Sequence, residues 1–483
     1  MQEKTFHRVI LKSTGLFGIA HLVKIVAKIV TNKIAAIYLG AIGIGIIGIV
    51  ENLLSILFGL VNFGLSSSSV REIALLSNDD ASSKLKEARM IKVIYYWSLL
   101  SGILGFLIFT LTSYSFFQNT YPKDSSYFWF LTLGLYFVFF ALFSSRMAIL
   151  QAKREIKKMV RIQIYSSISH MIIAVTCYYF FGVDGIAMVL LFATFFSFLF
   201  VYFGTKHIKT ATEAISIKQA FSEGLPMVKI GLILSAGAII NQVAFYVIRL
   251  FLKDFMSLES LGIFQVSYTI LIGYLGIIFI VMSNDFYPQL CNLENDKTTF
   301  EKYINEQTQL ALYLVVPLVL LMYLIAPQLI TLLYSTSFLE VLLILKVALA
   351  GLILKTIAWP IGFISLVKGN KKLFFKQNLL SDLINVVLSI VLTKYFGLKG
   401  LGFAFSLMFL ASFIYNYYTV SNNYQFKYSK ETKSTMLISI SFGIIALSSF
   451  YWFDFSYKNF IILILFLLAV LFSFYKLKKQ VRR

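Results

Sequence analysis

Long apolar runs, separated by short polar segments, recur from one end of the 483-residue chain to the other. Each run holds roughly 20 residues, which is the length an α-helix needs to cross the hydrocarbon core of a bilayer. The pattern predicts an all-α polytopic membrane protein with about 14 transmembrane helices. The expected spans are residues 14–38, 42–66, 90–112, 127–150, 160–181, 183–203, 225–252, 260–283, 308–333, 341–367, 373–396, 401–420, 434–453 and 459–476.

Composition and charge agree with this membrane class. The chain is 59% hydrophobic and 13% charged, whereas soluble domains hold about 25% charged residues. A net charge of +21 could indicate a protein that binds nucleic acid. However, the segments between the spans alternate between the two sides of the membrane, and most Lys and Arg residues lie in the segments assigned to the cytoplasm. The positive-inside rule therefore accounts for the charge, and an even number of spans puts both termini in the cytoplasm. We expect no nucleic-acid partner.

A short turn motif indicates that the chain contains a repeat. The sequence FGVDG at 181–185 recurs as FGLKG at 396–400, and each copy stands between two predicted spans after a basic loop. A duplicated six-span unit predicts two lobes related by a pseudo-two-fold axis along the membrane normal, as in transporters with a central cavity. Chance similarity between two turns rich in Gly and Phe is the alternative. The expected domains are an N-terminal lobe at 1–205, a cytoplasmic linker at 206–224, a C-terminal lobe at 225–421 and an extra transmembrane hairpin with a basic tail at 422–483.

The extra hairpin has no counterpart in the repeat. Its spans carry Ser and aromatic residues but almost no charge. They predict either a lipid-facing pair of helices packed on the second lobe or a groove for a long isoprenoid tail.

Three basic residues form a stripe within the first predicted span. His21, Lys24 and Lys28 follow the i, i+3, i+7 spacing that places residues on one face of a helix. A lysine at bilayer depth costs about 2.5 to 3.5 kcal/mol on insertion scales. The stripe therefore predicts an aqueous, substrate-binding cavity lined by cations, and the alternative is a structural ion pair. Glu51 in the second span is the expected charge partner, or else a protonatable residue for ion coupling.

Polar residues in the second half provide further candidates. Gln242 and Arg249 are seven residues apart in the seventh span, and Lys355 is central in the tenth; we expect all three to bind substrate in the cavity. Arg249 could instead snorkel to the outer membrane surface. Asp382 and Asn385, three residues apart in the eleventh span, could pair with Lys355 or bind a coupling cation.

Motifs for other chemistry are missing from the sequence. It contains no Walker A motif, metal-ligand cluster or nucleophile motif, so we expect a transporter without a cofactor rather than an enzyme. The sequence GIGIIG at 43–48 matches GxGxxG, but it lies within a predicted span and indicates glycine-mediated helix packing.

Several short motifs, in order, resemble one transporter superfamily. They are YLGAIG at 38–43, GL at 64–65 with Arg71 after it, LGIFQ at 261–265, YPQL at 287–290 and the two FGxxG turns. With this set the chain resembles the multidrug/oligosaccharidyl-lipid/polysaccharide superfamily, and within it the Wzx-type O-antigen and polysaccharide-unit flippases. The resemblance covers both lobes.

This resemblance implies a function in the bacterial plasma (inner) membrane. Such flippases are V-shaped pairs of six-helix bundles that move undecaprenyl-diphosphate-linked oligosaccharide, such as an O-antigen unit of lipopolysaccharide or a capsule unit, from the inner to the outer leaflet. Membrane lipids and polysaccharide assembly proteins are the implied partners, and an H+ or Na+ gradient the implied energy source. Cations outnumber acids among the buried positions, which favours an anionic substrate.

Other functions remain compatible with the sequence. A multidrug exporter of the same fold would transport cations through Glu51 or Asp382. The predicted number of spans, fourteen, exceeds the twelve that are common among O-unit flippases. In this respect the chain resembles the lipid II flippases. A membrane-embedded polysaccharide polymerase or ligase would need a large outer loop, and the predicted outer loops are short.

Overall fold

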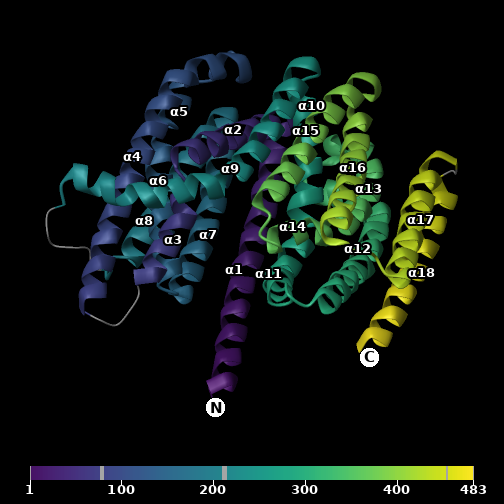
Figure 1. The fold of residues 1–483 in the computed structure, drawn as a ribbon. Helices are drawn as coiled ribbons and strands as arrows, with labels where there is room; N and C mark the ends of the chain where they lie inside the picture. Colours follow the sequence, from purple (N-terminus) through teal and green to yellow (C-terminus); the bar gives the residue numbers. More distant parts are fainter. Residues whose placement is uncertain (1, 77–80, 209–214, 453–454, 482–483) are drawn as a thin grey trace. The chain divides into compact units, whose positions relative to one another are not determined.

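The structure, a computed structural model, describes residues 2–76, 81–208, 215–452 and 455–481 (Figure 1). Over these residues the regular structure is helical, without a β-strand. Twelve described segments are long and apolar enough to cross a membrane, and one of them, Ile156–Gly204, consists of two helices. If the two helices of that segment are counted separately and the 37-residue first helix is added, each predicted span corresponds in position to one helical segment. The prediction of an all-α polytopic membrane protein is confirmed.

The chain folds into two compact units, and the boundary between them falls inside one long helix. We call Met1–Val243 the N-terminal unit and Ala244–Arg483 the C-terminal unit. The helices that begin in the N-terminal unit are α1 (Gln2–Tyr38), α2 (Gly40–Val61), α3 (Leu65–Leu76), α4 (Ala81–Thr120), α5 (Tyr127–Thr132), α6 (Leu135–Ala152), α7 (Ile156–Phe181), η1 (Gly182–Asp184), α8 (Gly185–Gly204) and α9 (Ile217–Phe255).

The C-terminal unit contains the second part of α9 and the remaining helices. They are α10 (Leu258–Tyr268), the π-helical turn η2 (Thr269–Tyr274), α11 (Ile277–Asn292), α12 (Lys297–Leu333), η3 (Thr336–Phe338), α13 (Val341–Gly362), α14 (Ile364–Val367), α15 (Lys371–Phe396), α16 (Leu398–Tyr424), α17 (Lys430–Trp452) and α18 (Phe455–Val481). The eighth predicted span is thus not a uniform α-helix, because η2 interrupts it between α10 and α11. Such π-helical insertions are common near functional sites.

The two FGxxG turns have the same backbone geometry. Gly182 and Gly397 both end a helix with a positive φ, +53° and +57°, a conformation that glycine adopts without the steric cost of a side chain. Each turn has another glycine three residues later, Gly185 or Gly400. A Cβ on Gly185 would lie 2.5 Å from a carbonyl oxygen of the preceding helix, and a Cβ on Gly400 would lie 2.2 Å from one. Both glycines therefore allow the next helix to begin tightly against the last one.

The same packing pattern surrounds both turns. In the N-terminal unit α6 packs against α4 and α8, and α7 packs against α8; in the C-terminal unit α13 packs against α12 and α16, and α15 against α16. The helix pair at each turn and the helix beside its second member are thus packed alike, although α7 also packs extensively against α1.

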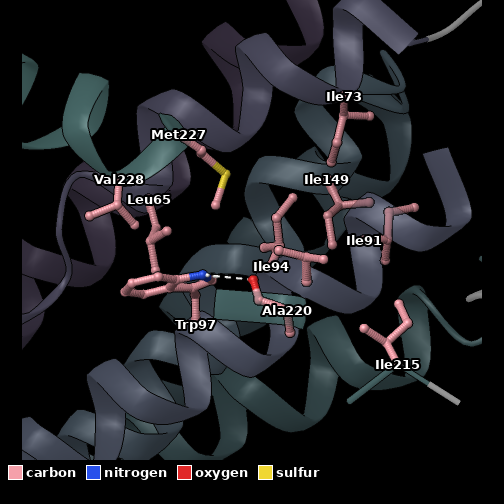
Figure 2. Packing of buried hydrophobic residues seen from close by; sticks show 11 residues of the cluster. Leu65, Ile73, Ile91, Ile94, Trp97, Ile149, Ile215, Ala220, Met227 and Val228 are labelled. Carbon is pink, nitrogen blue, oxygen red and sulfur yellow. Dashed lines mark hydrogen bonds between the residues drawn. The ribbon is translucent and has the colours of Figure 1, made fainter. Parts of the chain in front are cut away.

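The first part of α9 is anchored in the core of the N-terminal unit. Figure 2 shows Trp97 of α4 among buried aliphatic side chains, with its Nε1–H donating to the carbonyl of Ala220 at 3.2 Å. A Cβ on Gly224 would fall 2.1 Å from that indole nitrogen, and a Cβ on Gly231 would fall 2.2 Å from the carbonyl of Phe63. Two glycines therefore let α9 lie directly on its neighbours.

The segment predicted as a linker, 206–224, is only partly a loop. Its residues 209–214 lie outside the described residues, and from Ile217 onward it forms the first turns of α9. Ala220 belongs to the buried core cluster of the N-terminal unit.

The extra hairpin packs on one side of the C-terminal unit. Helix α17 contacts α12 and α13, and α18 contacts α12 (Figure 1). Polar contacts join the same helices: Gln309 Nε2–H donates to Thr432 Oγ1 at 2.7 Å, and the Ser429 N–H donates to Asn305 Oδ1 at 2.9 Å. These hydrogen bonds hold the start of the hairpin on α12.

Candidate functional site

The basic stripe of α1 lies on a face that the N-terminal unit leaves uncovered. His21, Lys24 and Lys28 are exposed, whereas Ala20 and Ala27 on the adjoining side of the helix are buried. Helix α1 packs along α7 and α2, so the sequence folds with its small residues against neighbouring helices and its cations pointing away. The positive face is therefore accessible to a ligand.

A polar cavity of about 280 Å³ lies in the same unit. Its wall includes Glu51 of α2, Tyr136 of α6, His170 of α7 and Thr194 of α8. Lys28 is close enough to His170 to interact with it electrostatically. The structure thus brings a residue of the basic stripe, a carboxylate and an imidazole into one region of the N-terminal unit.

The charges of this region are not joined into ion pairs. Among the residues that the structure describes, no carboxylate oxygen lies within 4.0 Å of the amine of Lys24 or Lys28, and Glu51 is exposed. The expected partner of the lysines is therefore nearby without neutralising either of them by direct contact.

Gln242 has a different neighbour from Arg249, although both lie on α9. The Asn52 side-chain amide of α2 donates to Gln242 Oε1 at 2.7 Å and to its carbonyl oxygen at 3.2 Å. Gln242 thus belongs to the N-terminal unit, and it fixes α9 against α2. The spacing of seven residues predicts one face for the two side chains, but the contacts divide them between the units.

Arg249 is buried in the C-terminal unit, with an exposed fraction of only 5%. Its Nη2 donates to Gln265 Oε1 at 3.0 Å, and its Cζ lies between 5.6 and 5.8 Å from the ring centres of Phe245, Phe264 and Tyr268. An arginine held by an amide and three aromatic rings does not snorkel.

Lys355 also lies against aromatic rings. Its Nζ is 5.0 Å from the ring centre of Phe279 and 5.5 Å from that of Phe409, and the residue is partly buried. Within the described part of the chain no carboxylate lies within 4.0 Å of this amine. The structure therefore does not form the expected ion pair between Lys355 and Asp382.

Asp382 and Asn385 lie on the α15 side of this aromatic region. Asp382 acts electrostatically on Tyr268, the same ring that Arg249 approaches. Asn385 is buried, and it lines a small cavity of about 70 Å³ that is otherwise formed mainly by apolar and aromatic side chains. The C-terminal candidates thus meet around Tyr268, in a packed rather than an open environment.

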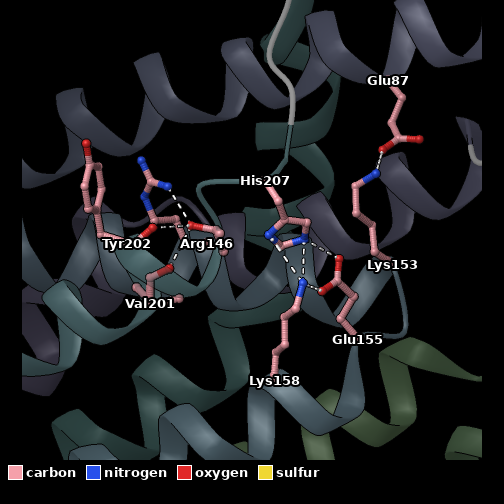
Figure 3. A network of polar contacts seen from close by, with 9 residues as sticks. Glu87, Arg146, Lys153, Glu155, Lys158, Val201, Tyr202 and His207 are labelled. Atoms are coloured by element: carbon pink, nitrogen blue, oxygen red, sulfur yellow. Dashed lines mark hydrogen bonds and ion pairs between the residues drawn. The ribbon is translucent and has the colours of Figure 1, made fainter.

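Sequence reasoning did not single out His170 as a site residue. Its signal was available, since an ionisable residue inside a predicted span is a functional candidate by default. Arg146 is a second such residue: its Nη1 donates to Thr205 Oγ1 at 2.7 Å, and its Cζ lies 4.9 Å from the ring centre of Tyr202 (Figure 3).

A network of ion pairs lies at the polar end of the N-terminal unit. Figure 3 shows Glu87 paired with Lys153, and Glu155 between Lys158 and His207. Burial raises the pKa of the Glu155 carboxyl, but hydrogen bonds from Lys158 and His207 outweigh it and leave the pKa below the ordinary value. This network joins α7 to the residues that follow α8.

A further ion pair joins α4 to the first part of α9. The Arg89 guanidinium donates two hydrogen bonds to the Glu223 carboxylate, at 2.6 and 3.0 Å. These bonds hold the pKa of Glu223 below its usual range. Such a bidentate pair fixes the angle between two helices.

A protein-family model described as polysaccharide biosynthesis protein matches residues 39–343 of the chain. No curated protein sequence matches it. This match confirms the resemblance to the superfamily, and solved transporters share the fold.

Three solved structures illustrate the similarity of fold. The lipid II flippase MurJ, in an inward closed conformation, is 18% identical with a TM-score of 0.72, and the match covers 97% of this chain and 100% of that one. An inward-facing multidrug resistance MATE family transporter of the MOP superfamily is 14% identical, with a TM-score of 0.71 over 83% of this chain and 95% of that one. A MOP superfamily transporter from Pyrococcus furiosus, described with a binding pocket of reverse polarity, is 15% identical, with a TM-score of 0.60 over 85% and 96%.

Proposed function

Because the chain belongs to the polysaccharide biosynthesis protein family, we propose that it is a flippase for undecaprenyl-diphosphate-linked oligosaccharide. It would carry an O-antigen, capsule or exopolysaccharide unit from the inner to the outer leaflet of the bacterial plasma membrane by alternating access. Both termini would lie in the cytoplasm. The substrate would enter with its diphosphate head group while its lipid tail stays in the bilayer.

The observation that carries this proposal is the uncovered positive face of α1. Lys24 and Lys28 are exposed in their unit and lack carboxylate partners within 4.0 Å among the described residues. A lysine ammonium is a compact charge with three donors, which suits phosphate oxygens. At bilayer depth such charges are retained against an insertion cost of about 2.5 to 3.5 kcal/mol each, and an anionic head group would offset that cost.

Glu51 and His170 are candidates for coupling transport to an ion gradient. Both line the polar cavity of the N-terminal unit, and Lys28 acts electrostatically on His170. A carboxylate and an imidazole that line one cavity can each take up and release a proton. H+ is thus the coupling ion that this arrangement supports.

Two other substrates fit the same fold. The similarity to MurJ extends over the extra hairpin, which supports a lipid-linked substrate and makes lipid II the second candidate. A cationic drug, the substrate of a multidrug exporter of this fold, would meet the lysines of α1 with like charge. We therefore favour a lipid-linked glycan.

The test is a paired substitution in cells whose surface glycan depends on this protein. Replacing Lys24 and Lys28 with Ala should reduce glycan export at least about tenfold, since two charge-assisted contacts would be lost. The readout is surface glycan, with membrane insertion measured by fractionation.

The matched control replaces Lys371 and Lys372, two exposed lysines at the start of α15, with Ala. It removes the same charge and should leave export unchanged. Normal surface glycan in the Lys24/Lys28 variant would contradict the proposed site.

A further inference from the structure

A cavity of about 970 Å³ lies in the C-terminal unit, apart from the residues around Tyr268. The first turns of α12, the segment 427–431 that leads into α17, and the last turns of α18 form its walls. In the predicted topology all three belong to the cytoplasmic surface. This volume is in the range of pockets that hold small-molecule ligands.

The walls of the cavity are held in place by contacts between the hairpin and α12. Gln309 of α12 donates to Thr432 of α17 at 2.7 Å, and Lys476 of α18 lies 3.2 Å from the Glu431 carboxylate of α17. Gln309 is buried. The cavity is therefore built by the packing of three helices rather than by a surface loop.

Positive charge exceeds negative charge around this space, with five lysines and three glutamates in the lining. Glu431 is paired with Lys476, and Glu306 lies 3.9 Å from Lys302. Lys427 and Lys479 have no carboxylate within 4.0 Å among the residues that the structure describes. Two lysines in one cavity without acidic partners suit a phosphate group.

Glu301 indicates a second chemical group that a ligand of this cavity should carry. Its Oε1 atom is buried and accepts no hydrogen bond within the described structure, and Glu301 lines the same cavity. A buried carboxylate oxygen needs a donor, so a matching ligand carries a hydroxyl or ammonium group beside its phosphate. A diphosphate would instead bring a second negative charge against the glutamates.

The helices beside the cavity carry apolar side chains that no protein covers. On α18 these include Leu467, Leu471, Phe474 and Tyr475, and on α17 Leu437. Exposed apolar residues of this kind on membrane helices contact acyl chains. The polar cavity thus lies at the end of an apolar helix pair, as the head group of a lipid lies at the end of its tails.

We propose that this cavity binds the head group of a membrane glycerophospholipid, with Lys427 and Lys479 on the phosphate and Glu301 on the head-group donor. The acyl chains lie along α17 and α18. The site differs from the one proposed for the transported substrate in its unit, its residues and its single phosphate. A lipid bound there stabilises the hairpin against α12.

The experiment is native mass spectrometry of the full chain in detergent micelles, titrated with phosphatidylglycerol. In the double variant Lys427→Gln/Lys479→Gln, affinity for the first bound lipid should fall by roughly fivefold for each lysine removed. Lys371→Gln/Lys372→Gln removes the same charge from exposed positions on α15 and should bind like the wild type. Melting without added lipid checks that both variants are folded.

A second comparison tests Glu301. Phosphatidylglycerol presents hydroxyl donors beside its phosphate, whereas phosphatidylmethanol, which is also a singly charged phosphodiester, has none. The wild type should prefer phosphatidylglycerol, and Glu301→Gln should bring the two affinities close together.

Three outcomes would overturn the proposal. They are equal binding by the Lys427/Lys479 variant and its control, an unchanged lipid preference in Glu301→Gln, and equally tight binding of soluble glycerol phosphate, which would assign the cavity to a soluble anion. Because binding is measured without export, failure here is separate from failure of the Lys24/Lys28 test.

Discussion

In the N-terminal unit, Lys24 and Lys28 are exposed on one face of α1, and Glu51 and His170 line a cavity of about 280 Å³ in the same unit. In the C-terminal unit, Arg249 and Lys355 lie against five aromatic rings, and the cavity beside them holds about 70 Å³. Both arrangements place cations on predicted spans. Only the first leaves those cations exposed on the surface of their unit.

The difference separates two uses of a cation in a membrane helix. A ring face and an amide oxygen partly replace the water that Arg249 would otherwise have, so the guanidinium can stabilise helix packing. Lys24 has no such contact among the described residues. The energetic cost of placing the charge of Lys24 at bilayer depth is therefore offset by solvent or by a ligand. We therefore propose that the N-terminal unit provides most of the substrate-binding residues.

The largest expected contrast is in stability. Arg249→Ala should destabilise the protein by about 2 to 4 kcal/mol, because it removes a buried side chain, its bond to Gln265 and three ring contacts. Lys28→Ala alters an exposed position and should stay within about 0.5 kcal/mol. Thermal melting in detergent measures both. Equal shifts would mean that the two units do not differ as described.

A smaller effect is expected for Lys355→Met, which keeps the length of the side chain and removes its charge. Replacing a charge that packs against apolar groups with an apolar side chain is often neutral or stabilising, so stability should change by less than about 1 kcal/mol. Export should fall only about two- to threefold, since rings already cover much of the amine. Lys346→Met is the control, because Lys346 also lies on α13 over a ring, that of Phe450. An export defect as severe as that of the Lys24/Lys28 variant would put substrate binding in both units.

The smallest effect concerns pH and the ion pairs of the N-terminal unit. The folded-state pKa of Glu223 lies below the ordinary value of 4.5, so its pairing with Arg89 contributes fully above that pH and is lost as the pH falls through the lowered pKa. Glu223→Gln should melt slightly earlier at pH 7, and its melting should depend less on pH between 5 and 3. An unchanged acid dependence in the variant would show that this pair does not anchor α9.

Much of the fold follows from local sequence. Apolar runs of membrane length give the crossings, and the glycines of the FGxxG turns give two tight connections that share one geometry. The interruption at Thr269–Tyr274 was not predictable in this way, because a hydropathy pattern does not distinguish an α-helix from a π-helical turn. The continuation of the predicted linker into α9 depends on Trp97, which is more than a hundred residues away.

For the candidate site, the sequence identified most of the residues but not which of them lie together in the folded protein. The spacing of Lys24 and Lys28 predicts their common face, which the structure contains. Gln242 and Arg249 share a helix, yet one bonds Asn52 and the other Gln265. Such partners lie far apart in the chain or on other helices, so helical periodicity does not reveal them.

The sequence by itself determined a helical membrane protein with basic loops and a positive stripe on its first span, because hydropathy, charge and helical spacing are local properties. Only the tertiary structure decided which cations are covered. Burial depends on the side chains that other helices bring, such as the rings around Arg249 and the small residues that bind α1 to its neighbours. For the same reason the cavity beside α18 became visible only once residues 297–310, 427–431 and 476–479 were folded against one another.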